Sequence, residues 1–165
     1  VEAIGKVATK PLDAHLMIEH PEKYVDRFAK VGVNMLSFHL NAVENAGQVL
    51  AQIRAAGMKP GLAINPDIPV ERLFPYLDQC DYVVLMSVFA GFGGQKFIEA
   101  TIERVSELRK MIDAGHHNVL IEVDGGVDDN TAPRLVAAGC NVLVSGSYIF
   151  NASDPYRIIS ELKSL

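Results

Sequence analysis

The chain has 165 residues, of which 49% are hydrophobic and 21% charged, with 20 acidic and 15 basic side chains. This length is typical of one domain, and the apolar fraction is sufficient for a buried core, so disordered and low-complexity classes are excluded. The formal net charge of −5 argues against a protein that binds nucleic acid or an anionic membrane, because both partners favour a basic surface. A local anion site remains compatible with this charge.

The cysteines and the hydropathy pattern bear on location. Cys80 and Cys140 are far apart and have no metal-binding spacing, so we expect reduced thiols and a cytoplasmic chain. No apolar run reaches the roughly 18–20 residues of a membrane span, so no membrane partner is expected.

Short apolar runs rich in β-branched residues alternate with amphipathic segments. The runs are 6 or 7 residues long, which suits buried parallel strands, and they cover 11–17, 35–40, 59–64, 82–88, 119–124 and 141–147. The intervening segments predict helices over 21–30, 44–56, 69–77, 97–114, 129–138 and 154–165. This alternation predicts an α/β fold with a parallel sheet.

Polar side chains fall at the carboxyl ends of successive predicted strands, as they do in TIM-type barrels. They are Asp13, His15, His39, Asn65, Ser87, Asp124, Ser145 and Ser147. No GxGxxG motif follows the first strand, which disfavours a dinucleotide-binding fold. We therefore expect a fold of the (β/α)8 TIM barrel type, of which this chain holds six βα units.

His15 is the first candidate site residue. Side-chain alternation places Asp13, His15 and Met17 on one face of the first strand, where the imidazole could carry a proton or hold a ligand. The alternative is an ordinary histidine that is hydrogen-bonded to its neighbours. The Asp-x-His pair on a buried strand favours the site, because burying unpaired polar groups is costly.

Glycine-rich loops follow the last three predicted strands. The segments are Gly-Phe-Gly-Gly at 91–94, Asp-Gly-Gly at 124–126 and Ser-Gly-Ser at 145–147. Glycines let the backbone approach a ligand closely, and their N–H groups can face an anion. Each loop alone could be a plain turn. Together they predict a phosphate site, because barrels commonly bind phosphate after their last two strands.

These segments resemble the ribulose-phosphate 3-epimerase family over essentially the whole chain. The resemblance rests on His-Leu-Met at 15–17, Phe-His at 38–39, Gly-Leu-Ala-Ile-Asn-Pro at 61–66, Gly-Phe-Gly-Gly-Gln-Lys-Phe at 91–97, Glu-Val-Asp-Gly-Gly-Val at 122–127 and Val-Ser-Gly-Ser at 144–147. It implies a (β/α)8 barrel of the pentose phosphate pathway that interconverts D-ribulose 5-phosphate and D-xylulose 5-phosphate. It also implies a divalent metal, zinc or iron, with manganese or cobalt as further options.

The resemblance assigns roles to individual residues. It implies that His15 and Asp124 bind the metal and that Asp124 also exchanges the proton at C3. It implies substrate contacts from His15, Met17, Met86, Gly91, Phe92, Gly93, Gly94, Asp124, Gly125, Gly126, Val127, Gly146 and Ser147. Epimerisation beside a ketone passes through an enediolate, and two carboxylates on opposite faces act as acid and base.

The sequence departs from the family pattern in two ways. The family's first two strands, which carry two of four metal ligands and the second proton carrier, have no counterpart here. We therefore expect residues 1–165 to form a single domain, the C-terminal three-quarters of the barrel, which forms a homo-oligomer and lacks epimerase activity alone. Asn41 and the pair Phe89-Ala90 also differ from the family, at positions that bear on the lid and on substrate preference.

Three alternatives stay open. An epimerase for a six-carbon phosphoketose, such as allulose 6-phosphate, would share these loops. A metal-independent sugar-phosphate decarboxylase would need a lysine near a catalytic aspartate, and the predicted strand ends show none. An inactive phosphate-binding remnant would bind phosphate without exchanging the proton at C3.

Overall fold

The computed structural model describes residues 1–91, 94–115 and 117–165. Its six strands form one sheet whose spatial order follows the chain. They are β1 (Asp13–Leu16), β2 (Met35–His39), β3 (Lys59–Ile64), β4 (Tyr82–Met86), β5 (Leu120–Asp124) and β6 (Val142–Val144). Every neighbouring pair is parallel, which confirms the α/β prediction.

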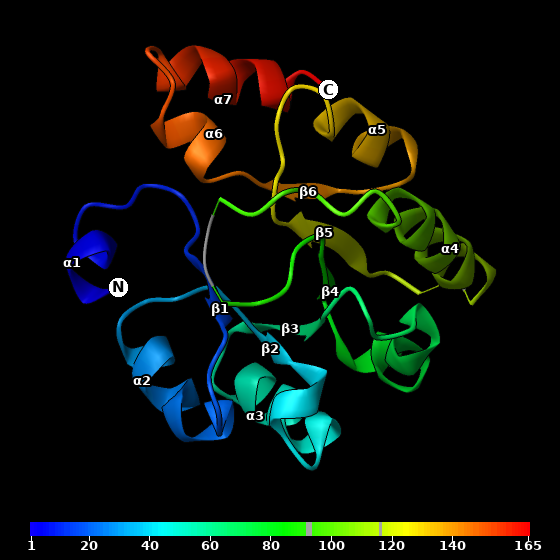
Figure 1. Ribbon diagram of the computed structural model, residues 1–165. Helices are drawn as coiled ribbons and strands as arrows, with labels where there is room; N and C mark the ends of the chain where they lie inside the picture. The colour runs from blue at the N-terminus through cyan, green and yellow to red at the C-terminus, as the bar shows by residue number, and fades with distance from the viewer. Residues whose placement is uncertain (92–93, 116) are drawn as a thin grey trace.

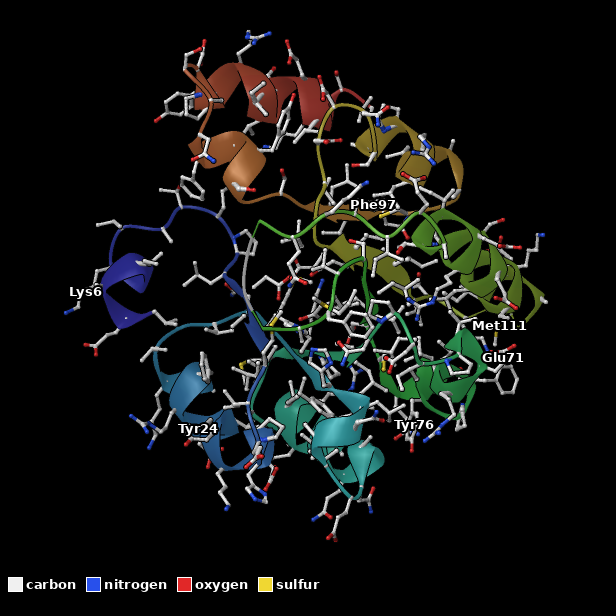
Figure 2. The ribbon with its side chains drawn as sticks, in the orientation of Figure 1. Lys6, Tyr24, Glu71, Tyr76, Phe97 and Met111 are labelled. Carbon is white, nitrogen blue, oxygen red and sulfur yellow. The ribbon has the colours of Figure 1, made fainter. Side chains whose placement is uncertain are left out.

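Helices surround the curled sheet on its outer side (Figure 1). They are α1 (Glu2–Gly5), η1 (Pro21–Tyr24), α2 (Val25–Lys30), η2 (Leu40–Ala42), α3 (Ala46–Ala55), η3 (Val70–Gln79), α4 (Thr101–Ala114), α5 (Ala132–Ala137), α6 (Ser147–Phe150) and α7 (Pro155–Lys163), where η marks a 3₁₀ helix. Figure 2 shows Lys6, Tyr24 and Tyr76 at the periphery, whereas Phe97 lies nearer the centre. The result is a barrel-type arrangement of six βα units.

Four predicted helices differ from the observed ones. The segment 21–30 divides into the 3₁₀ helix η1 and the short helix α2. The segment from residue 69 is the 3₁₀ helix η3, which contains Pro75, a residue that cannot donate the backbone hydrogen bond of an α-helix interior. Helix α4 begins at Thr101 rather than at residue 97. Helix α5 begins late because the carboxylate of Asp128 accepts the backbone N–H groups of Asn130 and Thr131, which holds these residues in a turn.

Side-chain alternation along each strand separates two apolar clusters. The outward-facing residues of the strands, such as Leu36, Phe38 and Leu85, pack against the helices in the main core. The inward-facing cluster fills the curl of the sheet and consists of Ala63, Tyr82, Val84, Met86 and Val88, with Met35 packed against it. The helices thus cover the outer face of the sheet, and the inner cluster covers the centre of its inner face, whereas inward-facing Leu120 on β5 is 40% exposed.

Gly61 makes room for the largest side chain of the inner cluster. Gly61 on β3 stands in register with Tyr82 on β4, and a Cβ atom added at Gly61 would lie 2.4 Å from Cζ of the Tyr82 ring. The ring therefore lies directly on the glycine backbone. Any larger residue at position 61 would push the ring aside.

The two edges of the sheet are open. Within the described part of the chain, β1 and β6 each pair on one side only. Unpaired backbone groups along such edges favour pairing with another chain. Where the structure is described, it contains no helix whose length and apolar character would allow it to cross a bilayer.

We expect the isolated chain to self-associate through these open edges. Sedimentation velocity in the micromolar range should show dimers or larger species. Association should persist at high salt, because backbone pairing and apolar contacts are less sensitive to screening than surface ion pairs. A monomer at every concentration would contradict this expectation.

The contact between Gly61 and Tyr82 predicts a large effect of one methyl group. Gly61→Ala should lower the free energy of unfolding by about 1–3 kcal/mol, the usual cost of overpacking a core, as measured by urea denaturation. Gly47→Ala on α3 is the matched control, because its Cβ would meet the flexible end of the Gln79 side chain and lie at an ordinary contact distance of 3.6 Å from Oδ1 of Asn45. Equal stability of the two variants would refute the packing account.

Candidate functional site

A pocket of about 190 Å³ lies at the carboxyl ends of β4 and β5. Seven of the predicted substrate residues line it: Met17, Met86, Gly91, Gly94, Asp124, Gly125 and Gly126. Met86 is 1% exposed, so it belongs both to the inner cluster and to the pocket wall. Among the residues that the structure describes, Asp124 is the only titratable side chain in this lining. We call this the Asp124 pocket.

A second pocket, of about 630 Å³, adjoins the first and shares Gly94 and Gly126 with it. Two more predicted residues, Val127 and Ser147, line this second pocket. Lys96 is the one basic side chain in its described lining, and the sequence prediction had not included it. We call it the Lys96 pocket. Two carboxylates, Glu99 and Asp128, also line it; Glu99 is paired with Arg134, and Asp128 accepts the backbone N–H groups of Asn130 and Thr131. The glycine loops and the ammonium group of Lys96 are the parts of this lining that suit an anionic group.

Two glycines after β5 are required by the backbone of the site. Gly125 and Gly126 have φ angles of +118° and +60°. A Cβ at Gly125 would lie 2.5 Å from Val88, and one at Gly126 would lie 2.9 Å from the backbone nitrogen of Phe97. Only glycine fits both the conformation and the space. The loop from Gly94 to Phe97 is thereby held close to the end of β5.

Two serines predicted at strand ends hold these loops in place. The single O–H of Ser87 is shared between the carbonyl oxygen of Asp124, at 2.9 Å, and that of Gly125. The Ser145 hydroxyl donates to the carbonyl of Val127 at 2.7 Å. Both hydroxyl groups therefore bind the protein's own backbone and position the loop that follows Asp124.

His15 lies on β1, and its ring stands between Ser37 and His39 of the neighbouring strand β2. Its Nδ1 lies 2.8 Å from the Ser37 hydroxyl, and its Nε2 lies 3.0 Å from Nε2 of His39. Burial, and then the neighbouring His39, lowers the pKa of His15 to about 4, so the imidazole is neutral at physiological pH. His15 lines neither the Asp124 pocket nor the Lys96 pocket.

Burial sets the acidity of the inward-facing carboxyl groups on β5. It raises the pKa of Asp124, and the charge of Asp13 raises it further. Glu122 lies two residues before Asp124 and is 2% exposed. Burial, together with Asp13, raises the pKa of Glu122 to about 9. Asp124 is therefore a stronger base than an exposed aspartate, and Glu122 is protonated at neutral pH.

The implied metal does not find a complete set of ligands here. In the described ranges 1–91, 94–115 and 117–165, no three His, Cys, Asp or Glu side chains are grouped as metal ligands. Catalytic zinc sites use three protein ligands, whereas His15 and Asp124 would supply two donors. These residues do not form a metal site by themselves.

The site predictions divide into three groups. The nine residues named above line the two pockets, whereas His15 and Gly146, the latter at the start of α6, lie outside both linings. Phe92 and Gly93 lie outside the described residues. Sequence reasoning missed Ser37, Tyr82 and Glu122, although alternation would have placed Ser37 with His39 and Glu122 with Asp124.

The raised pKa of Glu122 predicts a pH-dependent stability. The folded chain keeps the Glu122 proton up to about pH 9, whereas the unfolded chain loses it near the ordinary glutamate pKa of 4.5. Between these limits the folded state binds more protons, so its stability falls as pH rises, by up to about 1.4 kcal/mol per pH unit. Glu122→Gln removes this titration, so urea denaturation should show its stability rising relative to wild type across this range.

The exposed Glu103→Gln on α4 is the control for that experiment, and its pH dependence should parallel that of wild type. A Glu122→Gln variant whose stability also runs parallel to wild type would show that Glu122 is ionised in the fold.

Comparison with known proteins places the chain in a family. It matches the model of the Ribulose-phosphate 3 epimerase family over residues 1–150. It is 43% identical over 164 residues to ribulose-phosphate 3-epimerase of Bacillus subtilis, with 99% of this chain and 76% of that protein covered. It is 39% identical over 156 residues to the Escherichia coli protein of the same name, with 94% and 69% covered.

Solved structures support the barrel fold. The α-subunit of tryptophan synthase from Pyrococcus furiosus superposes with a TM-score of 0.72 at 18% identity, covering 99% of this chain and 71% of that one. A 3-hexulose-6-phosphate synthase superposes with a TM-score of 0.68 at 19% identity, covering 99% and 78%. Because the family match and the 43% identity extend over nearly all of its length, the chain belongs to the ribulose-phosphate 3-epimerase family of isomerases.

Proposed function

We propose that the chain acts in the epimerisation of D-ribulose 5-phosphate at C3 to give D-xylulose 5-phosphate. The observation that carries this proposal is the Asp124 pocket, in which one half-buried carboxyl group of raised pKa stands beside two obligatory glycines. Removal of the C3 proton requires a base beside the bound sugar phosphate. Asp124 supplies the base, and the glycine backbone lets the sugar phosphate approach it closely.

Asp124 is the proton carrier in this proposal. Its carboxylate takes the proton from C3, and the electron pair of the broken C–H bond moves toward the C2 carbonyl to form the enediolate. Return of the proton to the same face restores the starting sugar, and delivery to the opposite face gives the epimer. The described lining of the pocket holds one carboxyl group, so these residues account for one face.

The Lys96 pocket is the proposed phosphate site. The backbone N–H groups of Gly126, Val127 and Ser147 would donate to the phosphate oxygens, and Lys96 would add a positive charge. Binding at this site would hold the sugar so that C3 lies in the adjoining Asp124 pocket. The two pockets adjoin, because Gly94, Gln95 and Gly126 line both.

The family resemblance extends the proposal to a divalent metal ion, zinc or iron, or else manganese or cobalt. His15 and Asp124 would supply two of its ligands, and no step above depends on it. We also propose a cytoplasmic homo-oligomer whose partner is the sugar phosphate, with neither nucleic acid nor membrane as a partner.

A six-carbon phosphoketose is the second candidate substrate. A further pocket of about 330 Å³ shares Met17 and Gly91 with the Asp124 pocket. Asn41 and Ala90, which depart from the family pattern, both line this space. Such a space would suit a longer sugar such as allulose 6-phosphate. A faster C3 exchange with the six-carbon sugar than with ribulose 5-phosphate would favour this substrate.

The proposal predicts a strong effect of Asp124→Asn. The chain, supplied with each divalent metal in turn, is incubated with ribulose 5-phosphate or xylulose 5-phosphate in D2O, and deuterium at C3 is followed by NMR. We expect the isolated chain to exchange the C3 proton of one epimer without converting it, because its pocket holds one carboxyl group. Asp124→Asn should slow exchange by at least about a hundredfold.

Binding of inorganic phosphate, measured by calorimetry, should be unchanged in Asp124→Asn, because the backbone groups remain. Asp26→Asn on the outer helix α2 is the matched control and should exchange like wild type. If the unsubstituted chain binds phosphate but exchanges no proton with either epimer, the alternative of an inactive remnant is correct.

A further inference from the structure

A half-buried arginine joins the carboxyl ends of two neighbouring strands. Arg104 lies on α4, and its Nη2 donates to the carbonyl of Asn65 at 3.0 Å and to that of Ile68 at 2.7 Å. Its Nη1 donates to the carbonyl of Met86 at 3.4 Å. Asn65 directly follows β3, and Met86 is the last residue of β4. One guanidinium group therefore holds the ends of both strands and the start of the loop after β3.

The chemistry of this contact suits a guanidinium group. Each of the three acceptors is a backbone carbonyl, and a guanidinium carries five N–H donors in a fixed planar arrangement. A lysine ammonium group would have to reach the same three oxygens from one nitrogen atom. Burial lowers the pKa of Arg104, but an arginine stays charged at neutral pH. The three carbonyl dipoles offset part of the cost of burying this charge.

Asn65 connects this contact to the loop after β4. By side-chain alternation Asn65 continues the inner face of β3, and it lines the pocket of about 330 Å³. Its Oδ1 accepts the backbone N–H of Ala90 at 3.3 Å. The main chain of Asn65 is thus held by α4, while its side chain holds the main chain of Ala90.

The position of Ala90 and Gly91 determines the shape of the space beside Asp124. Ala90 lines the 330 Å³ pocket, and Gly91 lines both this pocket and the Asp124 pocket. Neither residue belongs to the described lining of the Lys96 pocket. A shift of Ala90 and Gly91 would therefore change the space for the sugar and leave the proposed phosphate site as it is.

We propose that Asn65 and Arg104 are positioning residues that hold the backbone of Ala90 and Gly91 beside the Asp124 pocket and thereby determine the affinity for the sugar part of the substrate. Gln95 supports the same segment, because its Nε2 donates to the carbonyl of the preceding residue, Phe89, at 2.8 Å. The effect on affinity rests on the proposed function, whereas the hold on the Ala90 N–H group is measured without any ligand.

Amide hydrogen exchange, followed by NMR on the ¹⁵N-labelled chain, tests this hold directly. In Asn65→Ala the Ala90 N–H loses its acceptor, so it should exchange about fivefold faster or more, the effect of one net hydrogen bond. Asn65→Asp keeps an acceptor oxygen and should retain the wild-type rate. Arg104→Met keeps the apolar stem but removes the donors, so it should also speed exchange at Ala90.

The amide of Leu85, which is fully buried on β4, reports any general loss of stability in the same spectra. Arg157→Met is the matched control for Arg104→Met, because it removes a guanidinium group whose side chain is 61% exposed on α7, and it should leave the Ala90 rate unchanged. A rate at Ala90 that stays at the wild-type value in Asn65→Ala, or that rises only as much as the rate at Leu85, would overturn the proposal.

Ligand affinity separates this inference from the proposed function. By calorimetry, Asn65→Ala should bind ribulose 5-phosphate about fivefold more weakly or worse, whereas inorganic phosphate should bind as it does to wild type. Equal weakening of both ligands, or of neither, would overturn the positioning role. A wild-type chain that binds no ribulose 5-phosphate would contradict the proposed function and the effect on affinity, and exchange at Ala90 would still test the hold on the backbone.

Discussion

The alternation of side chains in a curled parallel sheet is the constraint on which the rest of the structure depends. Every second residue of each strand faces the inside of the curled sheet, and a polar group that is buried there needs a partner from another strand. Leu36 and Phe38 face the helices, while Ser37 between them faces inward to His15. The same rule places Glu122 and Asp124 inside and gives both carboxyl groups raised pKa values.

The same constraint links the hydrogen-bonded side chains inside the sheet to the pockets at the carboxyl ends of the strands, where the proposed chemistry takes place. Beneath the pockets, polar side chains from β1, β2 and β4 are linked by hydrogen bonds, such as that from Tyr82 to Asp13. Above them, the loops after β4 and β5 are closed by backbone contacts that admit only glycine at 125 and 126. Asp124 stands between these two regions. Burial in the interior raises the basicity of Asp124, and the loops give it access to a ligand.

Much of this arrangement could be predicted from the sequence. All six strands, their parallel order and the position of the glycine loops after β4 and β5 follow from local patterns, because buried strands and tight turns depend on neighbouring residues. The 3₁₀ helix η3 and the late start of α4 did not follow, since they depend on Pro75 and on how Phe97 packs against Gly126. The hydrogen bonds of His15 with Ser37 and His39 were also missed, because register between strands is a tertiary property.

The central claim is that a sugar phosphate binds at the carboxyl ends of β4 to β6. It is tested most directly by titrating the ¹⁵N-labelled chain with ribulose 5-phosphate and mapping the amide shifts. The account predicts that the changes concentrate at residues 125–127 and 146–147, with Gly94 and Lys96. Changes confined to the separate cavity beside α3, which Asn45 and Gln48 line, would contradict it.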